Sequence, residues 1–236
     1  MAITLSESLS HTLVKRILAL FALFGVPIVA FVGLANEVKE TNPVPGDLAI
    51  LHGLHALSSP FMDALFVTLT TLGSAPVVIA IVLLILVYLV RHKHHRDALF
   101  VLAAAGGAAL LNVFFKVLFH RARPSLWQQI VTEKGYSFPS GHAMISCSLA
   151  LTIIILCWPT RWRRLAIIGG SVYFVLVGIS RLYLGVHYPS DVVGGWLVSV
   201  AWIYLIHRAF GAFSPTKQKE TEDQPIEVSA ATPAHK

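Results

Sequence analysis

Long apolar runs dominate this sequence and decide what it can fold into. They occupy residues 17–35, 76–90, 98–118, 143–158, 165–179 and 192–206. A helix of about 20 apolar residues crosses the roughly 30 Å hydrocarbon core of a bilayer. Only 13% of the residues are charged, whereas soluble domains carry about 25%. We therefore predict an all-α, polytopic membrane protein in which six transmembrane helices form one bundle.

A single membrane domain, residues 17–210, contains all six runs. Residues 1–16 are predicted to be a short cytoplasmic segment. Residues 211–236 are polar, mixed in charge and poor in aromatics, so we predict a disordered cytoplasmic tail. The first run could instead be a cleaved signal peptide, because residues 33–35 resemble a small-x-small cleavage site. It is longer than the usual apolar region of about 7–15 residues, which favours a retained anchor.

The segment before the second run is rich in helix breakers. Residues 36–60 contain Asn-Pro, Pro-Gly and Ser-Pro pairs, which predict a loop with one short helix at residues 47–57. Residues 61–72 are predicted to form a half-buried or interfacial helix, and Gly73 to Pro76 then interrupt the apolar pattern.

Basic residues predict the orientation of the bundle. Lys15, Arg16, Arg208 and the clusters at 91–96 and 161–164 fall on one side, which the positive-inside rule makes cytoplasmic. Six spans return both termini to that side. The opposite side also carries basic residues, which oppose the rule: Lys116, Arg121, Arg123, Lys134 and Arg181. We interpret these exceptions as an anion-binding site outside the cytoplasm, at a cell membrane.

Several other kinds of protein are disfavoured. The net charge is +6, but its basic residues form no cationic face or recognition motif, so we predict no nucleic-acid partner. Cys147 and Cys157 lie about 15 Å apart if both are on one helix, too far for a disulfide. Their spacing matches no metal-binding pattern. The sequence does not indicate an oligomeric state.

The first candidate segment of the anion site closes the third run. Lys116 and Arg123 are seven residues apart, close to two helical turns, which predicts that they share one helix face. Pro124 then ends the helix. The alternative is that both side chains reach for lipid headgroups from a helix end.

The second segment, residues 139–142, precedes the fourth run. Pro139, Ser140 and Gly141 predict a turn that exposes backbone N–H groups at a helix N-terminus, where anions are favoured. Ser140 adds a hydroxyl donor, and His142 follows directly. An ordinary helix N-cap with an incidental histidine is the alternative.

The third segment joins the fifth and sixth runs. Arg181 supplies a planar guanidinium suited to phosphate oxygens. His187 and Asp191 are four residues apart, so the carboxylate can hold one imidazole nitrogen and leave the other as a nucleophile. Pro189 predicts a turn rather than a regular helix at this point. The alternative is an Asp191 helix cap beside a surface histidine.

Together these segments resemble the type 2 phosphatidic-acid phosphatase superfamily, which includes bacterial undecaprenyl-diphosphate phosphatases and is related to vanadium-dependent haloperoxidases. The family signature is Lys-x6-Arg-Pro, Pro-Ser-Gly-His and Ser-Arg-x5-His-x3-Asp. The chain matches it in order at residues 116–124, 139–142 and 180–191. The six-span layout extends the resemblance to roughly residues 17–208.

The resemblance implies a phosphatase acting on a membrane lipid phosphate or diphosphate without metal or cofactor. His187 would attack phosphorus, Asp191 would hold its tautomer, and His142 would act as general acid and then as base towards water. The implied phosphate-binding residues are Lys116, Arg123, Ser140, Gly141 and Arg181. No outer-face carboxylate cluster suited to Mg²⁺ is apparent, and three cations can stabilise the charge instead.

Other functions remain possible for this site. The site could serve a lipid phosphotransferase, a haloperoxidase-like enzyme that holds vanadate, or a non-enzymatic lipid-binding or transport relative. The substrate could be undecaprenyl diphosphate, phosphatidylglycerophosphate or phosphatidic acid. Trp127, Tyr136 and Phe138 are expected to line the entrance or to anchor the loop at the interface.

Overall fold

The structure is a computed structural model that describes residue 14 and residues 18–212. Within these residues the chain is helical and contains no β-strand. The elements are η1 (Phe21–Gly25, a π-helical turn), α2 (Val26–Glu40), α3 (Asp47–His55), α4 (Pro60–Leu72), α5 (Ala75–Arg91), α6 (His95–Phe119), α7 (Gly141–Cys157), α8 (Arg163–Tyr183) and α9 (Pro189–Ala212). The predicted N-terminal segment, except residue 14, and most of the predicted tail lie outside the described residues.

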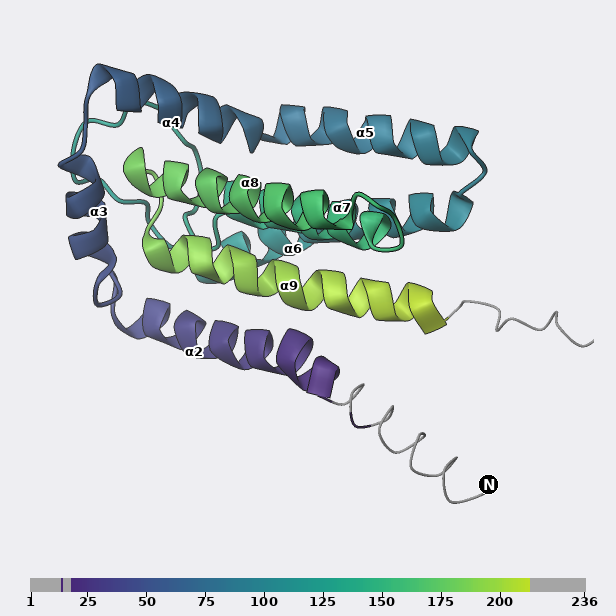
Figure 1. Cartoon of the computed structure of the whole chain (residues 1–236). Helices are drawn as coiled ribbons and strands as arrows, with labels where there is room; N and C mark the ends of the chain where they lie inside the picture. Colours follow the sequence, from purple (N-terminus) through teal and green to yellow (C-terminus); the bar gives the residue numbers. More distant parts are fainter. Residues whose placement is uncertain (1–13, 15–17, 213–236) are drawn as a thin grey trace, which may run out of the picture.

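The long helices run roughly side by side, and α7 lies at the centre of the bundle (Figure 1). Helix α7 packs against α6, α8 and α9 and also touches α5. Short helix α3 lies across one end, where the chain passes from α2 to α4. The first turn of α2 and the last turn of α9 both lie at the opposite end (Figure 1). The chain therefore passes up and down the bundle, and its loops fall at two ends.

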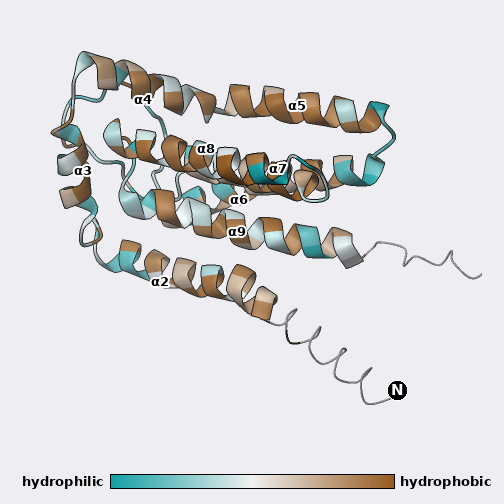
Figure 2. Ribbon diagram, in the orientation of Figure 1, coloured by the Kyte–Doolittle hydropathy of each residue, from teal (hydrophilic) through white to brown (hydrophobic). Residues whose placement is uncertain are grey.

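The helices agree with a multi-pass membrane protein. Four of them are long and apolar enough to cross a bilayer: Leu18–Glu40, His95–Phe119, Arg163–Tyr183 and Pro189–Gly211. Helices α4 and α5 together count as a fifth if they form one broken span, whereas α7 is a shorter apolar helix. Apolar residues cover the outside of the bundle (Figure 2), and Leu84 and Leu110 are more than 70% exposed. Such surfaces suit contact with lipid tails. Six crossings, as predicted, would require α4–α5 and α7 to be spans as well.

The predicted interruption between α4 and α5 is a bend of 43°. Gly73 ends α4, and Pro76 lies in the first turn of α5, where its missing N–H costs nothing. A Cβ atom at Gly73 would lie 2.3 Å from Cγ1 of Val177 in α8. Glycine is therefore needed for the bend to pack against α8. The predicted short helix near residues 47–57 is confirmed as α3.

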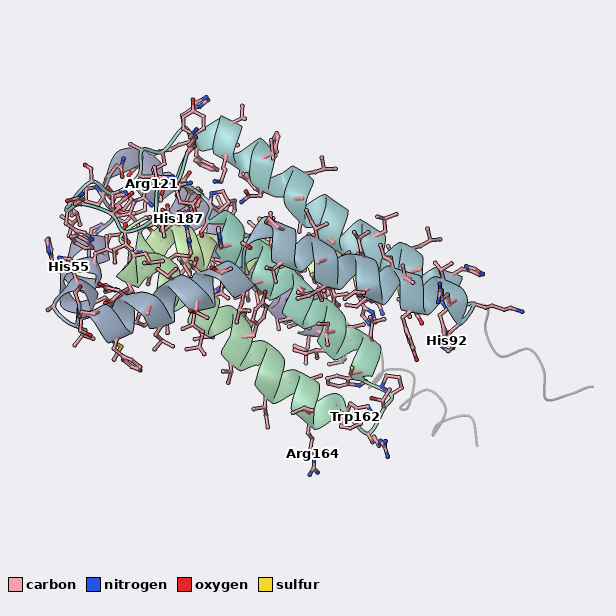
Figure 3. All side chains as sticks on the ribbon, turned by 90° about the horizontal axis from the view of Figure 1, so that it is seen from above. His55, His92, Arg121, Trp162, Arg164 and His187 are labelled. Carbon is pink, nitrogen blue, oxygen red and sulfur yellow. The ribbon has the colours of Figure 1, made fainter. Side chains whose placement is uncertain are left out.

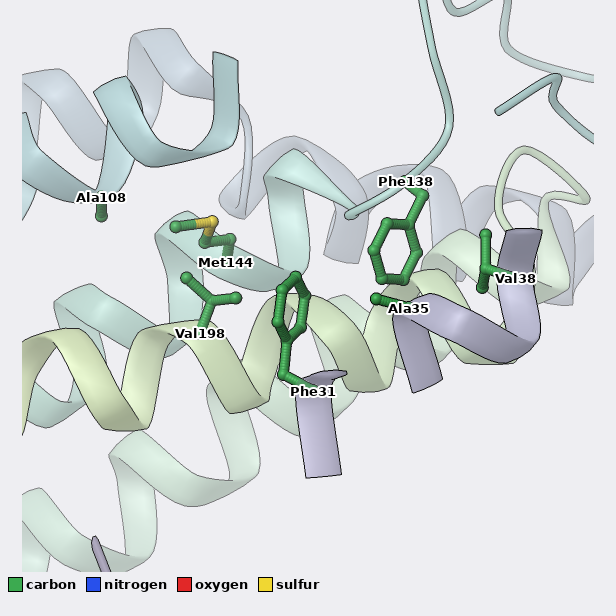
Figure 4. Close-up of a cluster of buried hydrophobic side chains, with 7 residues drawn as sticks. All are labelled: Phe31, Ala35, Val38, Ala108, Phe138, Met144 and Val198. Atoms are coloured by element: carbon green, nitrogen blue, oxygen red, sulfur yellow. The ribbon is translucent and has the colours of Figure 1, made fainter. Parts of the chain in front are cut away.

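An apolar cluster supports the end of the bundle that carries α3. It joins α2, α6, α7 and α9 to the loop before α7 (Figure 4). Phe138 is completely buried in it, with its ring stacked on Phe31 at a centroid distance of 5.7 Å and edge-on to Phe119 at 4.9 Å. The expectation that Phe138 lines an entrance or anchors at the interface is therefore wrong. Its ring fixes the loop that leads into α7.

Candidate active site

All three predicted segments lie at the end of the bundle that carries α3. Figure 3 shows His187 and Arg121 at this end, whereas His92, Trp162 and Arg164 lie at the other end. The segments come from the end of α6, the start of α7, and the connection between α8 and α9. The structure therefore brings the three segments together at one end of the bundle, as predicted, and the side of the membrane stays a prediction.

Arg123 reaches the site from a loop and not from a helix. Helix α6 ends at Phe119, and His120 adopts a left-handed conformation with φ 47°. The prediction that Lys116 and Arg123 share a helix face is therefore wrong, because the helix ends before Arg123. Arg123 is held instead by backbone acceptors: its Nη1 donates to Val186 O at 2.9 Å, and its Nε donates to Gly135 O at 3.0 Å.

Lys116 lies on the last turn of α6 and is half-buried. It is close enough to Arg123, Glu133, Asp191 and Arg181 to interact with their charges. Several cationic side chains therefore share one small region.

The start of α7 is fixed by its neighbours. Ser140 is the N-cap residue, and its backbone N–H donates to Asp191 O at 3.0 Å. Asn112 Nδ2 donates to Pro139 O at 3.2 Å. A Cβ atom at Gly195 would lie 2.9 Å from Ser140 O, so glycine lets α9 approach this turn closely. The first N–H groups of α7, which need external acceptors, are thus placed beside the third segment.

His187 and Asp191 form the predicted pair. Asp191 Oδ2 lies 3.2 Å from His187 Nδ1 and also accepts hydrogen bonds from Ser137 Oγ and from Tyr188 N. Helix α9 begins at Pro189, so a turn brings the two residues together, as predicted. The Nε2 atom of His187 lies 2.9 Å from Arg123 Nη1. Burial lowers the pKa of His187 to about 3, although Asp191 acts to raise it. The imidazole is therefore neutral, with Nε2 directed towards the cations.

Arg181 is a buried cation at the end of α8. Its Nη1 donates to Thr70 Oγ1 of α4, and its Nη2 forms an ion pair with Glu133. Within residues 18–212, no acceptor lies within hydrogen-bond distance of Arg181 Nε, and the buried Ser140 Oγ has no hydrogen-bond partner either. These two polar atoms have hydrogen-bonding capacity for a further oxygen-rich group.

Glu133 brings the predicted cations together, and sequence reasoning missed it. Its carboxylate pairs with Arg181, lies 3.9 Å from Arg123 Nη2, and lies 4.0 Å from His142 Nδ1. Burial acts to raise the pKa of Glu133, but the charges of Arg181 and His142 oppose it, and the pKa lies below its ordinary value. Three predicted site residues thus surround one anionic group.

Arg121 has a different role from the one predicted. It is buried, and it pairs with Asp191 Oδ1 at 2.6 Å and with Asp47 Oδ2 at 3.0 Å. Its inclusion among residues that bind an external anion is therefore wrong, because two carboxylates of the protein already hold it. Asp47 was also missed, since a single aspartate at the start of a short loop helix carries no recognisable signal.

Aromatic residues of the 125–138 loop contact the elements around the site. The Trp127 ring stacks on His55 of α3 at a centroid distance of 4.0 Å. The Tyr136 ring contacts His120 at 4.4 Å and is partly exposed. For these two residues the entrance or interface role stays a prediction.

Comparison with known proteins identifies the family. The family model described as the PAP2 superfamily matches residues 97–215, half of the chain. The chain belongs to the PAP2 superfamily. The PAP2 match begins after α5, so α3 and α4 lie outside it. Thr70 of α4 contacts the motif residue Arg181, and Asp47 of α3 contacts Arg121, which lies between the motif residues Lys116 and Arg123.

PAP2 relatives match much of the chain. It is 29% identical over 181 residues to phosphatidylglycerophosphatase B of Bacillus subtilis, which covers 75% of this chain and 89% of that protein. It is 39% identical over 85 residues to an undecaprenyl-diphosphatase of Sulfolobus acidocaldarius, 36% of this chain and 38% of the relative. The crystal structure of a transmembrane PAP2-type phosphatidylglycerolphosphate phosphatase from Bacillus subtilis has a TM-score of 0.74. It is 27% identical and covers 80% of this chain and 96% of that chain.

Proposed function

We propose that this protein removes phosphate from a membrane lipid phosphate or diphosphate through a covalent phosphohistidine at His187. The observation that carries the proposal is the convergence of Arg181, Arg123 and His142 on one carboxylate, beside the Nε2 atom of His187. A phosphoryl group would occupy this position in place of the Glu133 carboxylate. The membrane helices and the PAP2 lipid phosphatase relatives support a lipid substrate.

Binding comes first in the proposed reaction. Arg123, Arg181 and Lys116 would neutralise the phosphate oxygens, with planar guanidinium groups giving paired hydrogen bonds. Ser140 Oγ, Arg181 Nε and the Gly141 N–H at the start of α7 would supply further donors. Phosphoryl transfer depends chiefly on position and charge stabilisation, so these groups can do the work that Mg²⁺ performs elsewhere.

Two displacements then follow. His187 Nε2 attacks phosphorus and the bond from phosphorus to the leaving oxygen breaks. His142, in the imidazolium form that the negative charge of the bound phosphate would favour, gives that oxygen a proton and becomes neutral. Asp191 holds the proton on His187 Nδ1, so Nε2 is the unprotonated nitrogen. Its lone pair faces Arg123 Nη1 at 2.9 Å, and Arg123 would turn to the phosphate oxygens when the phosphate binds. His142 then takes a proton from water, whose oxygen attacks the phosphohistidine. The phosphorus–nitrogen bond breaks and inorganic phosphate leaves, so both histidines return to their starting states.

The site is proposed to face the outside of the cytoplasm. Arg91, Arg164 and Arg208 lie at or near the far ends of α5, α8 and α9, away from the candidate site. Under the positive-inside rule, that end is cytoplasmic. Six crossings would then put both termini in the cytoplasm and the site at headgroup depth. A lipid could offer its phosphate there while its tail stays in the bilayer.

A phosphate-release assay tests the proposal. The purified protein is given short-chain phosphatidic acid, phosphatidylglycerophosphate and farnesyl diphosphate, with His187→Ala as the blank. We expect phosphate release from at least one substrate, and the relative rates would identify the preferred class. Folded protein that releases phosphate from none of them would overturn the proposal. Transfer of phosphate to an added alcohol in preference to water would indicate a phosphotransferase, and vanadate-dependent halide oxidation would indicate haloperoxidase chemistry.

A further inference from the structure

A buried carboxylate from α3 is linked to the His187–Asp191 pair through Arg121. Asp47 is the first residue of α3, and only 3% of it is exposed. Its Oδ1 accepts from Ser190 N at 3.0 Å, and its Oδ2 accepts from Ser190 Oγ at 2.6 Å. It therefore holds the first turn of α9, directly before Asp191.

Arg121 connects Asp47 to Asp191. Its Nη2 donates to Asp47 Oδ2 at 3.0 Å, and its Nη1 donates to Asp191 Oδ1 at 2.6 Å. Its Nε donates to Asn42 Oδ1 at 3.0 Å, and its guanidinium lies 4.2 Å from the centre of the Tyr188 ring. The guanidinium is held on several sides, so its position relative to Asp191 is fixed.

The two oxygens of Asp191 consequently have separate partners. Oδ1 accepts from Arg121, while Oδ2 faces His187 Nδ1 and accepts from Ser137 and Tyr188 N. Rotation of the carboxylate would break bonds on both sides. Arg121 thus holds the plane of the carboxylate, and the carboxylate orients His187 through the contact between Oδ2 and Nδ1.

Charge balance explains why a second carboxylate is present. If Arg121 were paired with Asp191 alone, its positive charge would offset the negative charge of the carboxylate that faces His187. Asp47 offsets the positive charge of Arg121 in a region where all three side chains are almost completely buried. A buried charge is costly without a partner. With Asp47 in place, Asp191 keeps a net negative charge available to His187.

We propose that Asp47 is a positioning residue for the His187–Asp191 pair and that it acts through Arg121. Asp47 touches neither the phosphate position nor His187. Its role is to hold the Arg121–Asp191 geometry from α3, and the inference rests on the proposed phosphatase function.

Asp47→Asn tests this role because it keeps the size of the side chain and removes the charge. We expect kcat to fall about tenfold to a hundredfold, by analogy with residues that hydrogen-bond to metal-bound histidines and orient them. KM should stay within about twofold, since Asp47 does not contact the phosphate. Asp63→Asn is the matched control: Asp63 accepts from Tyr183 Oη at 2.6 Å outside the site, and kcat should not change. Gel filtration and thermal unfolding establish that each variant is folded.

A double variant separates positioning from support of the fold. In an Asp191→Asn background, Asp47→Asn should lower kcat by less than about threefold, because residues that act as one unit have non-additive effects. Single-turnover measurements with excess enzyme extend the assay to such slow variants. Equal factors in both backgrounds, or an unchanged kcat in Asp47→Asn, would overturn the inference.

Two further results complete the test. If Asp47→Asn does not fold, Ser190→Ala takes its place in the test. It removes the hydroxyl hydrogen bonds to both Asp47 and Arg121, so it should lower kcat several-fold without raising KM. An unchanged kcat there would overturn the inference in that case. Parent protein that is folded but inactive on every lipid phosphate contradicts the phosphatase proposal itself, whereas an active parent with unaffected variants contradicts only the role of Asp47.

Discussion

The carboxylate of Glu133 forms an ion pair with the guanidinium of Arg181, inside the group of cations that we assign to the substrate phosphate. Glu133 comes from the loop between α6 and α7, whereas Arg181 ends α8. A quarter of the Glu133 side chain is exposed, but only 1% of the Arg181 side chain. The loop thus supplies a negative charge that a phosphate would have to displace.

Removing this charge should strengthen the binding of phosphate-like anions. We predict that Glu133→Gln lowers the inhibition constant of orthovanadate about fivefold, which corresponds to about 1 kcal/mol. The amide keeps the shape of the side chain but no longer competes for Arg181 and Arg123. Inhibition of phosphate release is the measurement, and Glu133→Asp, which keeps the charge, is the control. Unchanged or weaker inhibition in Glu133→Gln would show that Glu133 does not compete for the phosphate position.

His187 should be indispensable. We predict that His187→Ala lowers kcat by more than about a thousandfold, because the proposed phosphohistidine cannot form without its Nε2 atom. Phosphate release by variant protein that elutes normally on gel filtration is the measurement. The stability of the protein-bound phosphate identifies the intermediate, because phosphohistidine survives alkali and is hydrolysed in acid. Parent protein quenched in alkali should retain phosphate on histidine, and the variant should not. Near-normal turnover in His187→Ala would show that His187 is not the nucleophile.

The sequence predicted the three segments that form the site because each carries its own local signal. A turn before α7, an arginine ending α8 and a histidine four residues before an aspartate depend on nearby residues only. Contacts between distant segments left no such signal. Arg121 and Asp47 are 74 residues apart, and neither residue alone carries a recognisable pattern. The position of Arg123 was mispredicted because a helical spacing of seven does not reveal that His120 ends the helix in a left-handed conformation.

Acid should destabilise the protein partly through His187. Its pKa in the folded protein is about 3, below the ordinary value of 6.5. The unfolded chain therefore gains a proton below about pH 6.5 while the folded protein does not. The stabilisation is fully present above that pH and is lost as the pH falls towards 3, by at most about 1.4 kcal/mol per pH unit. We predict that the thermal midpoint falls less between pH 7.5 and 5 in His187→Gln than in the parent. An equal fall in both would contradict the prediction.

Phosphate release should not depend on a divalent metal ion. Arg123, Arg181 and Lys116 can stabilise the transition-state charge that Mg²⁺ stabilises in other phosphoryl-transfer enzymes. We predict that activity in excess EDTA stays within about twofold of the untreated rate, since the cationic side chains remain in place. A magnesium-dependent phosphatase assayed in parallel shows that chelation is complete. Loss of activity in EDTA that added Mg²⁺ restores would overturn the metal-free mechanism.

The two ends of the bundle should be accessible from opposite sides of the membrane. Lys134 is exposed in the loop at the site end, and Arg164 is exposed at the other end, as Figure 3 shows for Arg164. We predict that a membrane-impermeant maleimide labels Lys134→Cys on intact cells but labels Arg164→Cys only after lysis. Both substitutions are made in a background in which Cys147 and Cys157 are replaced by alanine, and this background is the blank. Helix α7 is the one helix between residues 134 and 163, and labelling from opposite sides requires an odd number of crossings between the two labelled positions. That requirement makes α7 a span despite its length, and labelling of both sites from the same side would rule out the six-span topology.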